Sequence, residues 1–156
     1  MLKLRKNKKG FTLVELIVVI AIMAVLAGTV AGVTVTQLNK QTNNTAQTEV
    51  GNLVKEVQGF ITDYLTTSAT GIMNKDDMED ALDKFGTDEK GGKVTAVGAS
   101  GNFTKVAGQN SYEYKVEEVK EGVGDAAVLT GLKVTFGCLR KGKTSESITA
   151  DFTYPI

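Results

Sequence analysis

The sequence predicts an α+β protein in which a long N-terminal helix packs on a C-terminal antiparallel β-sheet. Residues 11–35 form an apolar run, and residues 37–65 continue with apolar side chains at helical spacing. From about residue 112 onward, apolar and polar side chains alternate with a period of two. The length of 156 residues suits about one folded domain. We expect three segments, residues 1–10, 11–35 and 36–156.

Positive charge is concentrated at the start of the chain. Residues 1–10 hold five basic side chains and no acid, which leaves 13 basic against 18 acidic side chains, a net charge of −5, in the remainder. This balance argues against a nucleic-acid-binding domain, so we expect no specific nucleic-acid partner. With no His and one Cys, the chain lacks the usual His-based catalytic and metal sites and cannot form an intramolecular disulfide. We predict no catalytic residue, no metal site and no cofactor.

The run at residues 11–35 is long enough to cross a membrane as a helix. Glu15 is its single charge, and residues 16–39 contain none. About 20 apolar residues cross a hydrocarbon layer of about 30 Å. The preceding cations place the N-terminal end in the cytoplasm. The run is longer than the apolar core of a secretory signal peptide and lacks the Ala-x-Ala type of cleavage site that follows such a core. An uncleaved signal anchor stays open as an alternative.

Glu15 needs a partner, because a carboxylate one turn inside a membrane span costs roughly 2–3 kcal/mol on insertion scales. Lys8 and Lys9 precede it by six or seven positions, too far for the i,i+4 pairing that a helix offers. A cut between Gly10 and Phe11 would create an α-amino group four residues before Glu15. That amine is a suitable counterion.

The segment KGFTLVEL at residues 9–16, together with the apolar run after it, resembles the class III signal of type IV pilins. The resemblance implies that a prepilin peptidase cuts after Gly10 on the cytoplasmic side and methylates the new amine of Phe11. It also implies that Glu15 pairs with the amine of a neighbouring subunit as the helix leaves the membrane for a filament. The usual proline of this family is replaced by Gly32.

The same resemblance implies a pilin-like fold, a precursor in the cytoplasmic membrane and then an extracellular pilus. The implied partners are further copies of the chain in a helical filament, the prepilin peptidase, the pilus assembly platform and minor pilins. A surface fibre of this kind serves adhesion, twitching motility or biofilm formation. Since the chain lacks the disulfide of many Gram-negative pilins, it looks like a major pilin of Gram-positive type.

Two other functions stay open at this point. One is a pseudopilin of a type II secretion or competence DNA-uptake system, which shares the same N-terminal chemistry. The other is a signal-anchored binding or catalytic domain. It would need an uncleaved N-terminus and a cluster of polar binding or catalytic side chains in residues 36–156, which we call the head.

The segment after the apolar run predicts the amphipathic half of the same helix. No proline interrupts residues 11–65, and the spacing of apolar side chains is helical. The polar residues 39–45 are the weakest part, and two helices with a linker are the alternative. The stripe expected to pack on the sheet consists of Ala46, Val50, Leu53, Val54, Val57, Phe60, Ile61, Tyr64 and Leu65.

A short acidic helix is predicted at residues 74–85, with Asn74 as its N-cap. Its apolar residues share one face. Its acids lack the Gly and the terminal Glu of a calcium loop, so we interpret them as a solvated face.

Short β candidates at residues 93–97 and 103–106 precede three longer antiparallel strands, which are joined by turns at residues 120–125 and 139–144. In the first of these three, Tyr112 and Tyr114 lie in the buried register and Glu113 in the solvated one. Cys138 falls in the buried register of the second. The basic residues of the last turn are interpreted as solvated.

Overall fold

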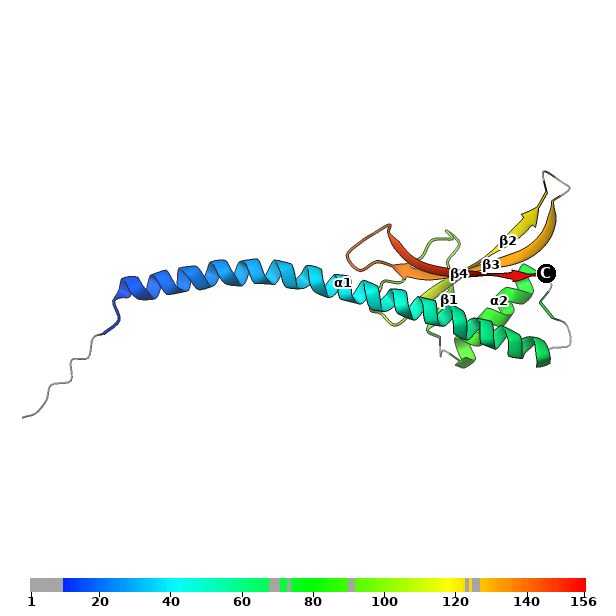
Figure 1. Ribbon diagram of the computed structural model, residues 1–156, viewed down its shortest axis with the longest axis horizontal. Coiled ribbons are helices and arrows are strands. Elements are labelled where there is room, and N and C mark those ends of the chain that lie inside the picture. Colours follow the sequence, from blue (N-terminus) through cyan, green and yellow to red (C-terminus); the bar gives the residue numbers. More distant parts are fainter. Residues whose placement is uncertain (1–9, 68–70, 73, 90–91, 123, 125–126) are drawn as a thin grey trace, which may run out of the picture. The chain divides into compact units, whose positions relative to one another are not determined.

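The computed structural model describes residues 10–67, 71–72, 74–89, 92–122, 124 and 127–156. Apart from Gly10, the predicted leader at residues 1–10 lies outside the described residues. The chain divides after Leu38 into two compact units. The elements, shown in Figure 1, are the helices α1 (Leu13–Thr67) and α2 (Lys75–Lys84), a π-helical turn η1 (Phe85–Glu89), and the strands β1 (Val94–Ala96), β2 (Tyr112–Glu121), β3 (Val128–Leu139) and β4 (Ser147–Pro155).

The helix α1 is continuous over its 55 residues, so the alternative of two helices with a linker is wrong. Residues 39–45, where we expected the weakest helix, are helical throughout. Polar side chains such as Asn disfavour a helix because they bond to their own backbone. Here the Asn43 Oδ1 instead accepts a hydrogen bond of 2.8 Å from the backbone N–H of Lys141. The polar stretch of the helix therefore makes a tertiary contact with the turn between β3 and β4.

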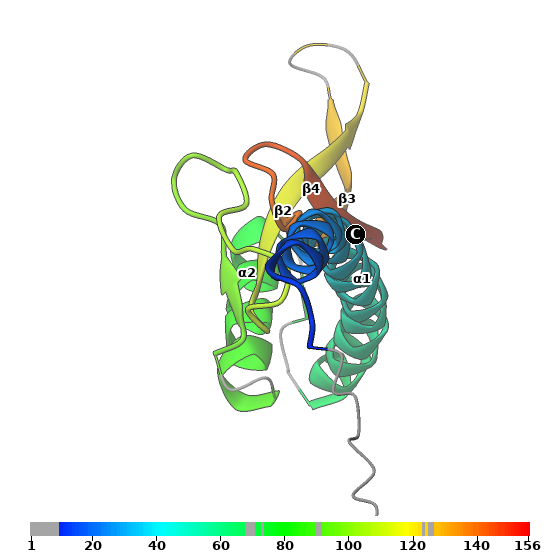
Figure 2. The ribbon, with the colours of Figure 1, turned by 90° about the vertical axis from the view of Figure 1, so that its left-hand side faces the viewer.

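The core of the second unit lies between the two helices and one face of the sheet. Figure 2 shows α2 and the C-terminal part of α1 side by side beneath the strands. The predicted stripe of α1 is confirmed, since five of its residues are buried and the others pack partly buried against the same cluster. The largest fully buried side chains of the core are Tyr114, Phe136, Met78, Leu82, Leu132, Val50, Val57, Val134 and Cys138.

The sheet is mixed, which corrects the expected antiparallel sheet. Its order is β1-β2-β3-β4. The antiparallel pairing of β2 with β3 and of β3 with β4 is confirmed, but β1 runs parallel to β2. Parallel neighbours need a crossover of a dozen or more residues, and residues 97–111 supply one. The short strand before this crossover cannot turn back as a hairpin and therefore pairs in the same direction.

The strand predicted at residues 103–106 is not formed. A single bridge joins Val106 to Leu139. The backbone N–H groups of Thr104 and Lys105 donate to the Glu113 carboxylate rather than to a neighbouring strand, the Lys105 bond at 3.0 Å. These two donors of the crossover thus bond to one side chain instead of to a neighbouring strand, whereas the Ala107 N–H donates to the Leu139 carbonyl at 2.8 Å.

Glu113 is buried, at 3 % exposure, although the alternation placed it on the solvated face. The crossover covers this face and brings Phe103 over Gly137 of β3, where an added Cβ would lie 3.0 Å from the Phe103 ring and 2.7 Å from the Ile148 carbonyl oxygen. Burial by itself would raise the pKa of Glu113. Hydrogen bonds from the Thr104 hydroxyl and from the backbone of Lys105 and Thr104 outweigh this effect, so that the pKa lies below its usual value.

We predict that Glu113→Gln destabilises the head and removes part of its acid sensitivity. The lowered pKa means that the ionised carboxylate stabilises the fold above the usual carboxyl pKa, and that this contribution is lost as the pH falls through the lower, folded-state value. At pH 7 the variant should lose about 1–3 kcal/mol of unfolding free energy, the cost of weakening charge-assisted bonds.

This prediction can be measured by denaturation of the full chain in detergent, followed by near-ultraviolet circular dichroism of the buried tyrosines. The difference between wild type and variant should shrink between about pH 5 and pH 3. A difference that stays constant over this range would show that the charge of Glu113 does not stabilise the crossover.

Two smaller predictions, on Asn74 and Cys138, are confirmed. Asn74 caps α2 with a full capping box, in which its side chain accepts from the Asp77 N–H at 2.9 Å. Cys138 is buried, and burial raises the pKa of its thiol. The last strand ends at Pro155. The π-helical turn η1 at the end of α2 was not predicted, because the pattern at residues 85–89 carries no signal for it.

Candidate functional site

The predicted site residues gather where α1 begins. Gly10 and Phe11 precede the helix, and Thr12 is the last residue before it. Glu15 is the third helical residue. Its Oε2 accepts hydrogen bonds from the Thr12 N–H at 2.8 Å and from the Thr12 hydroxyl at 2.9 Å. In return, the Thr12 Oγ1 accepts from the Glu15 N–H at 3.3 Å.

These reciprocal bonds are a capping box, the arrangement in which an N-cap Thr and a Glu three residues later satisfy each other's backbone donors. Thr12 was not expected as this partner, because only a cation was considered as the partner of Glu15. The signal was present, because Thr followed by Glu three positions later and by an apolar run is typical of a helix start. Glu15 therefore stabilises the helix start of its own chain. Both donors bond to the same oxygen, so Oε1 can accept from a further donor.

The helix surface that follows Glu15 is apolar and uncovered. Phe11 is 90 % exposed, and every residue from Phe11 to Leu38 is exposed within the described chain. A soluble monomer rarely exposes a contiguous apolar patch of more than a few hundred Å². This part of α1 is long and apolar enough to cross a membrane. Its large apolar side chains after Phe11 are Leu13, Val14, Leu16, Ile17, Val18, Val19, Ile20, Ile22, Met23, Val25, Leu26, Val30, Val33, Val35 and Leu38.

The family model described as the prokaryotic N-terminal methylation motif matches residues 5–31, which contain the whole of this helix start. This match supports a type IV pilin-like protein with a class III signal peptide. Comparison with curated proteins and with solved structures gave no match. The evidence for the family therefore comes from the N-terminal motif, and the α+β head with its long helix agrees with it.

For this pilin-like chain, the motif and the apolar helix fit a precursor anchored in the membrane and then a surface pilus. The motif implies processing by a prepilin peptidase and assembly into a filament. It also indicates a structural protein rather than an enzyme.

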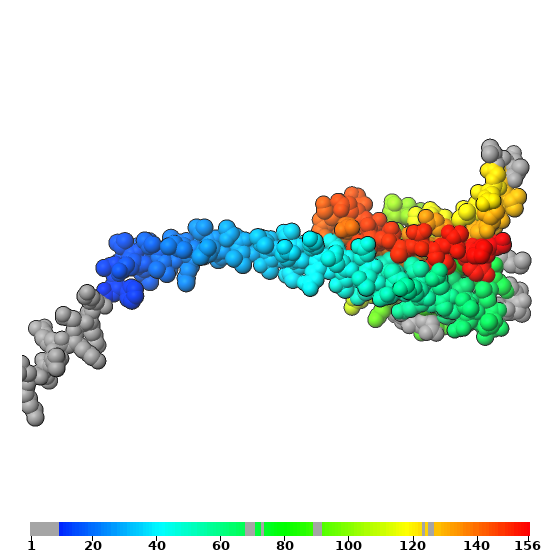
Figure 3. Space-filling model, viewed as in Figure 1, coloured from blue at the N-terminus to red at the C-terminus, as the bar shows by residue number. Residues whose placement is uncertain are grey.

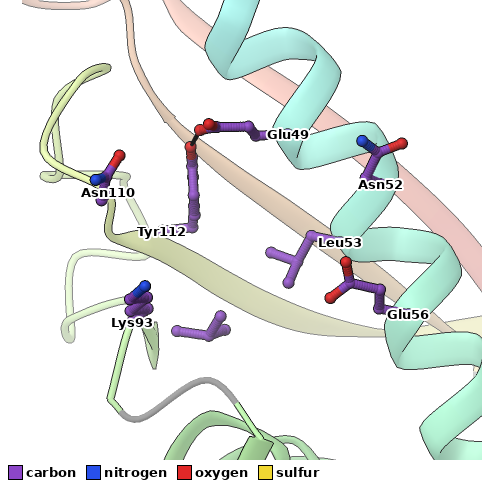
Figure 4. Close-up of a pocket in the computed structure, with 8 residues that line it drawn as sticks. Glu49, Asn52, Leu53, Glu56, Lys93, Asn110 and Tyr112 are labelled. Atoms are coloured by element: carbon purple, nitrogen blue, oxygen red, sulfur yellow. Dashed lines mark hydrogen bonds between the residues drawn. The ribbon is translucent and has the colours of Figure 1, made fainter.

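Figure 4 shows a pocket in residues 39–156 that is lined by both polar and apolar side chains. It is an open cavity of about 320 Å³ between α1, the start of β1 and the start of β2. The Tyr112 hydroxyl donates a hydrogen bond to Glu49 of α1 across its upper part. The pocket is lined by Glu49, Asn52, Leu53, Glu56, Lys93, Val94, Asn110 and Tyr112.

The chemistry of this pocket does not point to catalysis. Burial, and then the bond to Glu49, raise the pKa of Tyr112, so that the phenol stays protonated at neutral pH and acts as a donor. A Tyr that stays protonated at neutral pH is no general base. The Tyr112–Glu49 bond instead ties β2 to α1, as the 2.5 Å bond from the Tyr114 hydroxyl to Asp83 ties β2 to α2.

Among the described residues, no three His, Cys, Asp or Glu side chains gather in a way that could hold a metal ion. The acids of α2 are spread along the helix, and Glu79 forms an i,i+4 ion pair of 3.4 Å with Lys75. Their arrangement is that of a solvated helix face.

Proposed function

We propose that this chain is the structural subunit of a type IV pilus. In this proposal a prepilin peptidase cuts after Gly10 and methylates the amine of Phe11, and the mature chain polymerises through the apolar helix at residues 11–35. The observation that carries the proposal is an apolar helix surface, uncovered in a single chain, with one carboxylate at its start. Such a surface can be covered by lipid in the membrane-anchored precursor and by neighbouring helices in the filament.

The position of the peptide bond between Gly10 and Phe11 supports cleavage there. Both residues are exposed and precede the first turn of α1. A protease needs an unfolded stretch of backbone, because a helix hides its peptide groups in its own hydrogen bonds. Within the described part of the chain, no atom lies within 4 Å of a Cβ added at Gly10, so these residues leave room for a protease.

Glu15 supports assembly by pairing with a second chain. Inside lipid a lone carboxylate costs roughly 2–3 kcal/mol, and the bonds from Thr12 offset only part of this because they bring no positive charge. The amine of a neighbouring Phe11 supplies that charge. Because this pairing removes the insertion cost of the carboxylate, it favours side-by-side helices over isolated ones. The charge pair also sets the register between the helices.

The test is mass spectrometry of the cell-surface fraction together with electron microscopy of sheared material. A fragment that begins with N-methylated Phe11, found in long sheared fibres, is the expected result. The same fragment restricted to the cell envelope would favour the alternative of a pseudopilin of secretion or DNA uptake. A chain that keeps residues 1–10 would contradict both and favour a signal-anchored domain.

A further inference from the structure

The basic turn between β3 and β4 lies against the part of α1 that directly follows the apolar run. The Lys141 N–H donates to Asn43 at 2.8 Å, and a Cβ at Gly142 would lie 3.4 Å from the Asn39 side-chain nitrogen. Figure 3 shows this turn, in orange, against the cyan part of α1. The turn is therefore fixed at the level of residues 39–43 of the helix.

This level lies close to the membrane surface in the anchored precursor. If the apolar run fills the hydrocarbon layer up to residue 35, Lys40 stands about 8 Å beyond its boundary at about 1.5 Å per residue. The headgroup region adds about 5–8 Å on each side of the hydrocarbon. Residues 39 and 40, and Gly142 of the turn that packs on Asn39, thus lie at the outer edge of the headgroup region, whereas residue 43 lies about 12 Å beyond the hydrocarbon, a few Å outside it.

The charge at this level differs in sign from that of the remaining head. Two acids lie among five cations, a local net of +3, whereas residues from 11 onward carry a net of −5. Lys141 and Lys143 are exposed, and the acids of α2 and of the β2–β3 hairpin lie at the other end of the head (Figure 1). The five cations are Lys40, Lys105, Arg140, Lys141 and Lys143, and the two acids are Glu113 and Glu146.

The ion pairs within the turn leave its charge available. Glu146 lies 3.2 Å from the Lys143 Nζ and 4.0 Å from the Arg140 Nε, so one carboxylate is shared by two cations. Glu113 is buried beneath Lys105 and Thr104. Exposed pairs of this kind contribute little and do not prevent a cation from binding a phosphate.

We infer that this basic collar, defined as Lys40, Lys105, Arg140, Lys141 and Lys143, docks the head of the precursor on anionic phospholipid headgroups. Each Lys or Arg near an anionic bilayer surface strengthens association about fivefold, and the effect decays within a Debye length of about 8 Å at physiological salt. The inference depends on the membrane-anchored precursor and not on polymerisation. Its failure would leave the proposed pilus subunit untouched.

The experiment measures amide hydrogen exchange of the turn in the full chain, with one chain per nanodisc. In phosphatidylglycerol, exchange of the amides at residues 141–146 should be at least about fivefold slower than in phosphatidylcholine, which is the effect of one such cation. Addition of 0.5 M NaCl should abolish the difference. Amides in the middle of β3 report that the sheet is folded in each sample.

Two double variants make the test specific. Lys141→Gln/Lys143→Gln should remove the slow exchange in phosphatidylglycerol. Lys120→Gln/Lys133→Gln removes the same charge from lysines that pair with Glu118 and Asp151 elsewhere in the sheet, and it should leave the exchange slow. Equal exchange in the two lipids would overturn the inference. So would protection that appears only in discs with two chains, because it would identify a second copy as the partner.

Discussion

Glu15→Ala should be processed normally and should lose most of its filaments. The carboxylate lies after the cleavage position and is exposed at the start of α1, so its removal leaves the peptide bond after Gly10 accessible. Its role in the proposal is to make the isolated subunit less stable in lipid by roughly 2–3 kcal/mol, a cost that the neighbouring amine removes. Loss of this bias should weaken subunit addition by about 30- to 150-fold. The measurement is the ratio of mature subunit in sheared fibres to mature subunit in membranes.

The capping box provides the matched controls for this prediction. Glu15→Gln keeps a side chain that can accept from Thr12 but carries no charge, because Gln also serves at this position of a capping box. Thr12→Val removes the cap and keeps the charge. Charge pairing predicts that Glu15→Gln assembles as poorly as Glu15→Ala and that Thr12→Val assembles nearly as well as wild type. The opposite order would show that Glu15 acts by capping the helix, and the pairing proposal would then be wrong.

Gly10→Leu should block removal of the leader almost completely. The substitution places a bulky side chain directly before the bond that is to be cut, in a segment that must enter the peptidase. No atom of the described residues lies within 4 Å of a Cβ at this position, so the substitution should leave the described fold intact. The expected product is a membrane-bound chain that keeps residues 1–10, with no N-methylated Phe11 and no fibres.

The control for this substitution is Gly10→Ala, which adds a single methyl group. We expect partial processing, with mature and precursor forms resolved by intact-mass measurement of the membrane fraction. If Gly10→Leu were cleaved as completely as wild type at the same bond, the proposed cleavage position would have no requirement for Gly. If the cut moved to another bond, the assignment of Phe11 as the mature N-terminus would be wrong.

Elements with a strong period could be predicted from the sequence. The stripe of α1 and the apolar positions of β2, β3 and β4 each follow from which side chains must face one core, and the structure confirms them. Even the solvated acids of α2 follow from spacing alone. The helix start was equally predictable from Thr12 and Glu15, although its capping box was overlooked.

The parts that escaped prediction depend on contacts between distant segments. The direction of β1 follows from the path of residues 97–111 across the sheet, which no local pattern encodes. The burial of Glu113 has the same origin, since its register indicated solvent and the crossover covers it. The contact of Asn43 with the turn at Lys141, nearly a hundred residues later in the chain, likewise has no local signal. The Gram-positive type stays a prediction.

The continuity of α1 has a mechanical consequence. The buried side chains that join the helix to its sheet run from Ala46 to Ile61, a length of about 22 Å at about 1.5 Å per residue. Tension along the helix axis enters the head as shear that is shared by all of these contacts, rather than as peeling that breaks them one after another. A head built in this way resists force best when the force acts along the axis of α1.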